Sequence, residues 1–465
     1  MMMRGFVRRI HFVGIGGVGM SGIARVLLNL GYGVSGSDLR ETEVTRALTK
    51  AGARCFRGHR AAHTRGAQVV VVSSAVDPTN PELAVARAAG IPIVPRAEML
   101  AELCRIKRTV AVAGSHGKTT TTSMVALALA RAGADPTMII GGQLANIRSN
   151  ARLGGGDYLV AEADESDGSF VRLFPLVAVV TNVDDDHLDH YGTVERLRAA
   201  FVDYLHRLPF YGAAVLCADD PAVRALVPKV GRTVVTYGLR PGADWTARVL
   251  EDRGPIGSKT KGPGQRLRVF RRGRRVGELE LKVCGRHNAL NALAAVAVGD
   301  FLGFDLRKVF AGLGEFRGVG RRMENLGRAQ GVVFLDDYGH HPTEVAATLR
   351  ALKGAGRRLI VVFQPHRYSR TKLLHRRFGP ALRGADRVYV MDVYAAGEKP
   401  LRGVSSKLIL ESARRSGVDA RPFTRAVDLV RELRTGDVVL TLGAGDVWKA
   451  GLDLLRRLEG PTLSI

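Results

Sequence analysis

Stretches of strand length alternate with stretches of helical length over the first hundred residues. Ile10–Val13, Gly33–Asp38 and Val69–Ser73 are predicted strands, and the four valines of the last are typical of a parallel strand buried on both faces. Helices are expected at Met20–Leu30, Pro81–Ala89 and Ala97–Cys104. This alternation predicts an α/β domain with a parallel sheet.

A glycine-rich turn follows the first of these strands. Gly14, Gly16, Gly17 and Gly19 lie between the strand and the helix, and Asp38 stands nineteen residues after Gly19 at the end of the second strand. In dinucleotide-binding domains such a turn brings a pyrophosphate to the helix N-terminus, and the acid meets a ribose. Taken alone, the motif favours a Rossmann-like domain and an NAD-type ligand.

A second glycine-rich turn, Gly114–Thr119, organises the middle of the chain. The apolar strand Thr109–Ala113 precedes it, and a helix containing Met124–Ala130 follows it. In such a loop the backbone N–H groups cradle phosphates, Lys118 reaches the β- and γ-phosphates, and the Thr119 hydroxyl binds Mg²⁺. The turn is shorter than the standard eight-residue phosphate loop, but all of its parts occur in the expected order. The sequence therefore predicts an ATP site.

The segment Leu103–Arg108 is predicted to be a short linker that leads into this second α/β domain. Further strands of the domain are expected at Tyr158–Ala163, Val177–Thr181, Ala213–Leu216 and Thr233–Thr236. Trp245–Leu281 alternates apolar and polar positions around a loop at Gly254–Gln265 and a turn at Gly273, which predicts antiparallel hairpins. A helix at Asn288–Leu302 closes the domain.

A third α/β domain follows Gly318–Gly320. Its expected strands are Val332–Asp336, Leu359–Phe363, Arg387–Met391 and Val438–Leu442, with a helix at Thr343–Leu352. The predicted domains are therefore 1–106 (Rossmann-like), 107–318 (a central P-loop ATPase-type α/β domain with antiparallel hairpins) and 319–465 (Rossmann-like α/β).

The composition fits a globular protein and excludes some partners. Of the 465 residues 46% are hydrophobic, and no apolar run is long enough to cross a membrane. The net charge is +25, but the excess is spread along the chain and only 6% of the residues are aromatic, so no stacking platform for nucleic acid is expected. Met1–Ile10 is basic and precedes an apolar run, as in a signal peptide, but no small-x-small cleavage site follows. We therefore interpret the run as the first strand of a domain. The four scattered cysteines are expected to be buried thiols of a cytoplasmic protein.

Acidic residues follow two successive strands of the second domain. The first strand ends in Ala161–Asp167, and the next leads into Thr181–His190, which contains Asn182 and His187. Carboxylates at these strand ends face the phosphates and can hold Mg²⁺ directly or through water. A solvated acidic turn would explain either cluster alone, but two successive clusters favour a metal site.

Three further blocks of polar residues follow along the chain. Gly285–Asn291 places Asn288 and Asn291 on one face of a helical turn, where amides can recognise a base or a phosphate. Arg321 and Arg322 precede Asp336–Pro342, and Phe363–Thr371 brings a histidine and two arginines just beyond another strand.

In this order, the motifs resemble those of the Mur ligase family, ATP-dependent enzymes that form amide bonds in peptidoglycan precursor synthesis. The shared features are the Gly114–Thr119 loop, Glu162, Asn182–His187, His287–Asn291, Arg322 and Asp337. The blocks Ile10–Gly22, Asp336–Glu344 and Gln364–Thr371 are typical of the members that join L-alanine to UDP-N-acetylmuramate, and the resemblance covers essentially the whole chain. It departs at Ser115, where Thr is usual, and at Met323, where an aromatic residue is usual.

The resemblance implies that the first domain binds the UDP of the substrate instead of NAD, and that the enzyme uses ATP and Mg²⁺ to form an acyl phosphate on UDP-N-acetylmuramate before L-alanine attacks. It also implies a cytoplasmic monomer or homodimer with small-molecule substrates and without nucleic-acid or membrane partners. The UDP-sugar is expected at Gly14, Gly16, Gly17, Gly19, Asp38, Ser73 and Ser74. ATP is expected at Gly114, Ser115, His116, Gly117, Lys118, Thr119, Thr120, Asn288, Asn291, Arg322 and Asp337. Mg²⁺ is expected at Thr119, Glu162 and His187; the amino acid at Tyr338, His340, Arg367 and Arg370; and catalytic roles at Lys118, His187, His340, His366, Arg367 and Arg370.

Several alternatives stay open at this point. Either His340 or His366 can serve as the general base for the amine, and the histidines and arginines of the third domain can instead bind nucleotide phosphate. The recycling ligase that attaches a tripeptide to the same sugar nucleotide shares most of these blocks. An NAD-dependent oxidoreductase is a further alternative, but it would leave the phosphate loop without a function. A P-loop ATPase that acts on another anionic substrate or on nucleic acid is suggested only by the net charge of +25.

Overall fold

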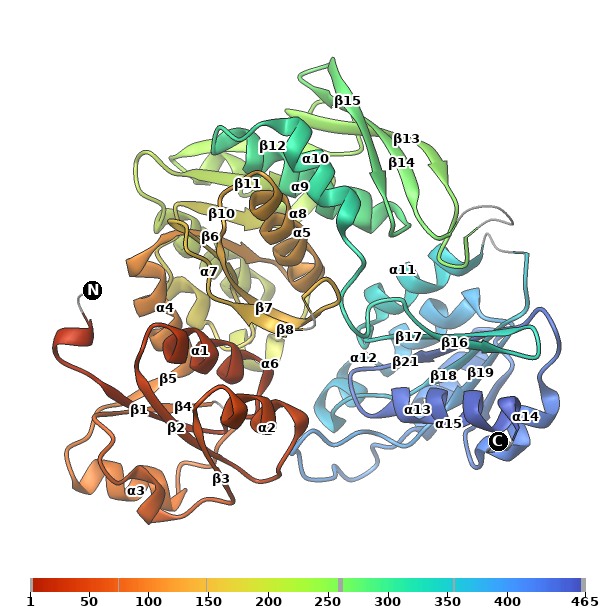
Figure 1. The fold of residues 1–465 in the computed structure, drawn as a ribbon. Coiled ribbons are helices and arrows are strands. Elements are labelled where there is room, and N and C mark those ends of the chain that lie inside the picture. Colours follow the sequence, from red (N-terminus) through yellow and green to blue (C-terminus); the bar gives the residue numbers. More distant parts are fainter. Residues whose placement is uncertain (1–2, 74, 148, 258–261, 354–355, 461–465) are drawn as a thin grey trace, which may run out of the picture. The chain divides into compact units, whose positions relative to one another are not determined.

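Three β-sheets, each flanked by helices, make up the computed structural model (Figure 1). It describes residues 3–73, 75–147, 149–257, 262–353 and 356–460. The chain divides into two compact units: the first contains Met1–Val249, Leu267–Glu280 and Asn288–Phe316, and the second contains Leu250–Arg266, Leu281–His287 and Arg317–Ile465. The α/β class predicted from the sequence is confirmed.

The N-terminal sheet is parallel throughout and has the strand order β3-β2-β1-β4-β5. Its strands are β1 (Arg9–Val13), β2 (Gly33–Asp38), β3 (Arg54–Arg57), β4 (Val69–Val72) and β5 (Ile93–Pro95). Its helices are η1 (Met3–Gly5), α1 (Val18–Asn29), α2 (Glu43–Lys50), η2 (Ala61–Thr64), α3 (Pro81–Ala88) and α4 (Arg96–Ile106). The strand order reverses between β1 and β4, and in open parallel sheets ligands bind at the carboxyl ends of the strands at such a point.

The central sheet is mixed and has the order β15-β14-β13-β12-β11-β10-β6-β9-β7-β8. Its strands are β6 (Arg108–Ala113), β7 (Thr137–Leu144), β8 (Ser149–Arg152), β9 (Tyr158–Glu162), β10 (Val177–Val180), β11 (Ala213–Cys217), β12 (Thr233–Gly238), β13 (Trp245–Asp252), β14 (Gln265–Arg271) and β15 (Arg274–Leu281). Its helices are α5 (Lys118–Arg131), η3 (Ser169–Arg172), α6 (Leu188–Tyr191), α7 (Val194–His206), α8 (Pro221–Arg224), η4 (Val227–Lys229), α9 (Arg286–Phe301) and α10 (Leu306–Glu315). Strands β9 and β10 flank β6 in parallel, so the ends of both strands lie beside the Gly114–Thr119 loop.

The C-terminal sheet has the order β16-β17-β21-β18-β19-β20 and is parallel except for the antiparallel edge strand β16. Its strands are β16 (Glu324–Ala329), β17 (Val332–Asp337), β18 (Leu359–Phe363), β19 (Arg387–Val390), β20 (Ala420–Pro422) and β21 (Val438–Leu442). Its helices are α11 (Pro342–Lys353), α12 (Tyr368–Ala381), η5 (Leu382–Gly384), α13 (Lys407–Arg415), α14 (Ala426–Glu432) and α15 (Val447–Glu459).

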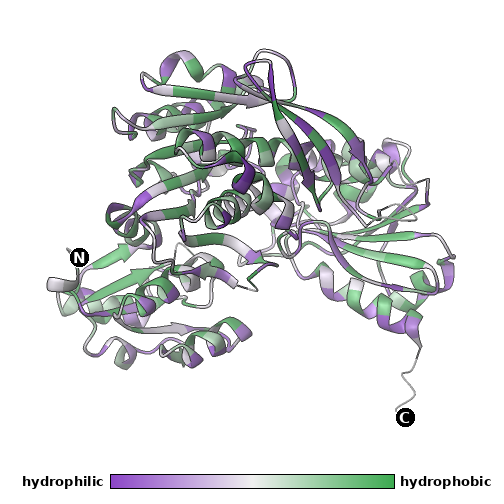
Figure 2. Cartoon of the chain, turned by 45° about the horizontal axis from the view of Figure 1, so that its top comes forward, coloured by the Kyte–Doolittle hydropathy of each residue, from purple (hydrophilic) through white to green (hydrophobic). Residues whose placement is uncertain are grey.

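Apolar strands form the interior of each sheet, as the colouring in Figure 2 shows. One continuous core joins the N-terminal and central sheets, since Ile10 and Phe12 of β1 belong to the same buried cluster as Ala111 of β6. Helix α1 also packs against β7 and β8. The first unit therefore fixes the glycine turn after β1 relative to the phosphate loop after β6.

The expected linker at Leu103–Arg108 is wrong. Helix α4 continues to Ile106, and β6 begins at Arg108. Leu103 and Cys104 are buried, because the apolar face of the helix continues to pack where the sequence suggested a boundary.

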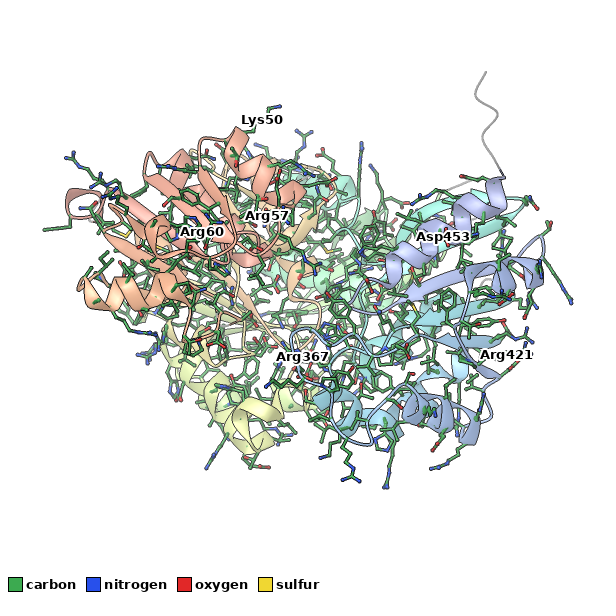
Figure 3. The ribbon with its side chains drawn as sticks, turned by 90° about the horizontal axis from the view of Figure 1, so that it is seen from below. Lys50, Arg57, Arg60, Arg367, Arg421 and Asp453 are labelled. Atoms are coloured by element: carbon green, nitrogen blue, oxygen red, sulfur yellow. The ribbon has the colours of Figure 1, made fainter. Side chains whose placement is uncertain are left out.

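The basic surplus lies at the surface in several places. Lys50, Arg57 and Arg60 are exposed side chains of the N-terminal domain, and Arg421 is exposed in the C-terminal domain (Figure 3). No helix in the described ranges combines the length and hydropathy needed to cross a membrane. Among the described cysteines all four are free thiols; three are buried, as expected, but Cys55 is only half-buried.

Candidate active site

The phosphate loop depends on two glycines. Gly114 has φ +129° and Gly117 has φ +80°, both in the region that favours glycine. A Cβ at Gly114 would collide with Thr181 Oγ1. Gly117 caps the N-terminus of α5, and unpaired N–H groups at such a terminus attract anions.

Residues after β10 hold this loop in place. Asn182 uses both ends of its amide, because Oδ1 accepts from His116 N at 2.8 Å and Nδ2 donates to His116 O at 2.9 Å. Thr181 Oγ1 donates to the same carbonyl at 2.7 Å, and His116 Nε2 lies 3.0 Å from Asp184 Oδ2. Asn182 therefore fixes the main chain of the loop.

Thr119 and Glu162 lie together, as a metal site requires. Thr119 Oγ1 donates to Glu162 Oε2 at 2.9 Å, and Gly141 N donates to the same oxygen at 3.0 Å. A hydroxyl and a carboxylate oxygen beside a phosphate loop are the donors that Mg²⁺ prefers. The residues present fit this ion.

Lys118 points back into its own loop and pairs with Glu165. Its Nζ lies 2.7 Å from Glu165 Oε1, and the carboxylate is fully buried. Burial opposes the charge on Lys118, but the carboxylates of Glu165, Asp164 and Glu162 raise its pKa above the usual value. His187 Nε2 lies 3.7 Å from the same Glu165 oxygen, so Glu165 stands between two residues predicted to act on ATP.

Asn291 lies against the loop and α5. Its Oδ1 accepts from Thr121 Oγ1 at 3.0 Å, and its Nδ2 lies 3.4 Å from Asn288 Oδ1. A Cβ at Gly117 would lie 3.1 Å from Asn291 Oδ1. The first unit thus brings Asn291, Lys118, Thr119 and Glu162 together around one helix terminus.

The glycine turn after β1 faces a cavity of about 290 Å³ in the first unit. Gly17, Gly19 and Ser73 line it from the N-terminal domain, and Gly141, Glu162 and Asp164 line it from the central domain. Arg96 also lines the cavity and donates to Asp164 Oδ2 at 2.9 Å. The cavity therefore connects the predicted UDP-sugar turn with the predicted metal ligand Glu162.

The remaining predicted UDP-sugar residues lie around the same turn. Asp38 Oδ2 accepts from Gly16 N at 2.9 Å, so it holds the turn. Gly14 has φ +84°, and a Cβ there would contact Ser73. Ser74 lies outside the described residues.

The second unit gathers the predicted amino-acid residues at the carboxyl ends of β17 and β18. The ring centroids of His340 and His366 are 5.6 Å apart, and Tyr338 packs edge-on to His340 at 5.5 Å. Arg370 Nη1 lies 3.5 Å from His366 Nδ1. Burial, followed by Arg370 and Arg367, lowers the pKa of His366 to about 4, so its imidazole is neutral at physiological pH.

Arg322 and Asp337 lie at the end of the same sheet. Arg322 Nη1 donates to Glu344 Oε1 at 3.2 Å, and its guanidinium lies 5.1 Å from the centre of the Tyr338 ring. Asp337 accepts from Met323 N and Gly339 N at 2.8 Å each. Burial raises the pKa of Asp337, in opposition to Arg322.

Three residues of the site were given no role of their own from the sequence. Glu165 was visible only as part of an acidic run, and Arg96 immediately precedes the predicted helix Ala97–Cys104. Arg321 holds the loop after β21, with donors to Gly443 O and Gly445 O and to Asp336 Oδ2 at 3.0 Å. Each contact joins residues at least fifteen positions apart, so no local pattern marks it.

Together, a glycine turn on a cavity lined by Glu162 and a phosphate loop whose Thr119 donates to the same Glu162 are typical of an enzyme that binds a nucleoside triphosphate. Comparison with models of known protein families identifies the family of this chain. The model of the Mur ligase family, catalytic domain, matches residues 9–108, that of the Mur ligase middle domain matches 112–299, and that of the Mur ligase, glutamate ligase domain, matches 321–445. The chain belongs to the Mur ligase family.

Individual relatives match over nearly their full length. The chain is 52% identical to the UDP-N-acetylmuramate–L-alanine ligase of Sorangium cellulosum, with 98% of each chain covered, and 52% identical to that of an Anaeromyxobacter species, with 97% and 98% covered. Its structure resembles the crystal structure of UDP-N-acetylmuramate-alanine ligase from Thermotoga maritima, with a TM-score of 0.80, 34% identity, and 97% of this chain and 98% of that chain covered.

Proposed function

We propose that this chain uses ATP to join L-alanine to the carboxylate of UDP-N-acetylmuramate, releasing ADP and phosphate. The observation that carries the proposal is the cavity shared by Gly17, Gly19 and Glu162. A UDP-sugar with its pyrophosphate at the glycine turn can reach towards Glu162 with its carboxylate. That carboxylate then lies beside the phosphate loop, where a γ-phosphate is bound.

The first chemical step makes an acyl phosphate. A carboxylate oxygen of the sugar attacks the γ-phosphorus, and the bond to the β-phosphate oxygen breaks as ADP leaves. Lys118 and the N–H groups of the loop neutralise the charge that spreads over the transferred group. Thr119 Oγ1 and Glu162 Oε2 would hold Mg²⁺, with His187 as the proposed further ligand, and the bound ion would screen the phosphate charges.

The second step forms the amide. Arg367 and Arg370 bind the α-carboxylate of L-alanine, since a guanidinium pairs with a carboxylate in a planar, bidentate way. His340 or His366 takes a proton from the amine, whose nitrogen attacks the acyl carbon as phosphate leaves. His366 is neutral but weakly basic, and His340 has Glu344 Oε2 3.5 Å from its Nδ1, so both remain candidates.

We assign one ligand to each of the three domains. Residues 1–106 bind the UDP-sugar, 107–318 bind ATP and 319–465 bind the amino acid. Asn288 and Asn291 contact the nucleotide from the central domain, and Arg322 and Asp337 from the C-terminal one. The enzyme acts in the cytoplasm on small molecules, without nucleic-acid or membrane partners.

Phosphate release against a panel of acceptors tests this function. With ATP, Mg²⁺ and UDP-N-acetylmuramate, we expect release to depend on L-alanine and to be slower with glycine or L-serine. Release that depends on the cell-wall tripeptide instead would identify a recycling ligase. Release stimulated by DNA in the absence of the sugar nucleotide would refute the proposal.

A further inference from the structure

Lys118 is held by three acceptors at once. Its Nζ donates to Gly114 O at 2.7 Å, to Ser115 O at 3.3 Å and to Glu165 Oε1 at 2.7 Å. A lysine ammonium has three N–H donors, so these contacts use all of them. A phosphate oxygen can therefore bind Lys118 only if one contact weakens or breaks.

Glu165 is the acidic member of this set, and its place is fixed. Burial raises the pKa of its carboxyl group to about 7, and Lys118 opposes that shift. The side chain is fully buried, and its Oε2 has no hydrogen-bond partner within the described part of the chain. Its backbone oxygen accepts from Tyr191 Oη at 2.6 Å and from Gly168 N at 3.0 Å. A buried carboxylate is costly without a cation, and Lys118 supplies that cation.

We propose that Glu165 is a positioning residue that sets the affinity for ATP: its carboxylate holds Lys118 in the loop and competes with the β- and γ-phosphates for the same ammonium. The inference rests on the proposed function, because ATP is the competitor. Two anions that share one cation weaken each other's contact. Tighter binding of the substrate alone does not raise kcat. A carboxylate that weakens ATP binding is therefore compatible with fast turnover.

The decisive variant is Glu165→Gln, which keeps the shape and an oxygen acceptor but removes the charge. Binding of ATP with Mg²⁺ to the full-length protein is measured by calorimetry without the sugar nucleotide. We expect the Kd for ATP to fall about tenfold, the change that removing one nearby buried charge can produce. The Kd for AMP, which lacks the competing phosphates, stays unchanged. Glu195→Gln removes an exposed charge from α7 of the same domain and serves as the matched control.

Each other outcome has a distinct meaning. An unchanged Kd for ATP in Glu165→Gln overturns the inference. A higher Kd, with a greater requirement for Mg²⁺, also overturns it and makes Glu165 a metal ligand beside His187. If the unaltered protein binds no ATP, the proposed function fails, and the inference that rests on it fails with it.

A double-mutant cycle tests the ion pair without any ligand. Lys118→Met leaves the Glu165 carboxylate buried without its cation, so the melting temperature should fall. Adding Glu165→Gln to that variant should recover part of the loss. If the double variant melts no higher than Lys118→Met alone, the two side chains are not coupled and the inference is wrong.

Discussion

The main chain of Arg367 is held in an uncommon conformation. Arg367 is exposed and has φ +68°, which is uncommon for arginine. The main chain is held there, because Arg367 N donates to Tyr394 O at 2.8 Å and Arg367 O accepts from Thr371 Oγ1 at 2.8 Å. Strain of this kind gathers at functional sites, which supports the assignment of Arg367 (Figure 3) to substrate binding.

Arg367→Lys is predicted to weaken L-alanine binding selectively. Lysine keeps the charge but loses the planar fork, so the KM for L-alanine should rise about tenfold while the KM for ATP stays nearly constant. Initial rates with each substrate varied in turn provide the measurement. A rise confined to the KM for ATP would instead assign the arginine to nucleotide phosphate.

At the scale of elements, the glycine turn after β1 depends on close approach. A Cβ at Gly16 would lie 2.8 Å from Asp38 Oδ2, the oxygen that accepts from Gly16 N. Gly16→Ala should therefore push Asp38 away and raise the KM for the UDP-sugar at least about tenfold, with a much smaller effect on ATP binding. Gly5→Ala is the control, since a Cβ at Gly5 meets nothing within 4 Å. Equal effects on both substrates would contradict a local role.

A buried acid ties α3 to the N-terminal sheet and predicts acid sensitivity. Glu82 is fully buried, with His63 Nδ1 at 2.8 Å, His59 Nδ1 at 3.5 Å and His11 Nε2 at 3.6 Å from its carboxylate oxygens. Burial alone would raise its pKa, but contacts from His11, Ser37 and His63 lower it to about 2. An acid whose pKa is lower in the folded state stabilises the fold at pH values above its unfolded pKa of 4.5. This contribution to stability is lost as the pH falls towards 2.

Glu82→Gln is predicted to flatten this pH dependence. The shift corresponds to about 3 kcal/mol at most, so the variant should be less stable near pH 7 and converge with the unaltered protein near pH 2. Melting temperatures of the full chain between pH 7 and pH 3 provide the measurement. Parallel curves for the two proteins would show that Glu82 makes no such contribution.

The same elements show what the sequence can predict. Strands β18 and β21 have their predicted bounds, because apolar strands between turn residues give a clear local signal. Strand β2 also has its predicted bounds, although Val34 is its single large apolar residue. Strands β7, β8 and β16 had no such signal: β7 contains two glycines and exposed positions, and β8 and β16 are mostly polar. Roles for motif residues such as Lys118 and Thr119 can be proposed from local order, whereas Glu165 and Arg96 contact residues that are distant in the chain.

At the scale of the whole molecule, the proposed ATP residues fall in two compact units. Lys118 and Asn291 belong to the first, and Arg322 and Asp337 to the second. The division runs between His287 and Asn288, within the first turn of α9, and again between Phe316 and Arg317. One nucleotide can contact both sets only when it holds the two units together, and enzymes that bind a substrate in this way close before chemistry.

Small-angle scattering can test this closure. Saturating ATP analogue and UDP-N-acetylmuramate should reduce the radius of gyration and narrow the distribution of distances, because ligand contacts favour the closed arrangement. The sugar nucleotide alone should have a smaller effect, since its proposed residues all lie in the first unit. Arg322→Ala removes a proposed contact from the second unit, so it should reduce the change while leaving UDP-sugar binding intact. Identical scattering with and without both ligands would mean that the two units do not close on the nucleotide, and Arg322 and Asp337 would then lose their assignment to ATP.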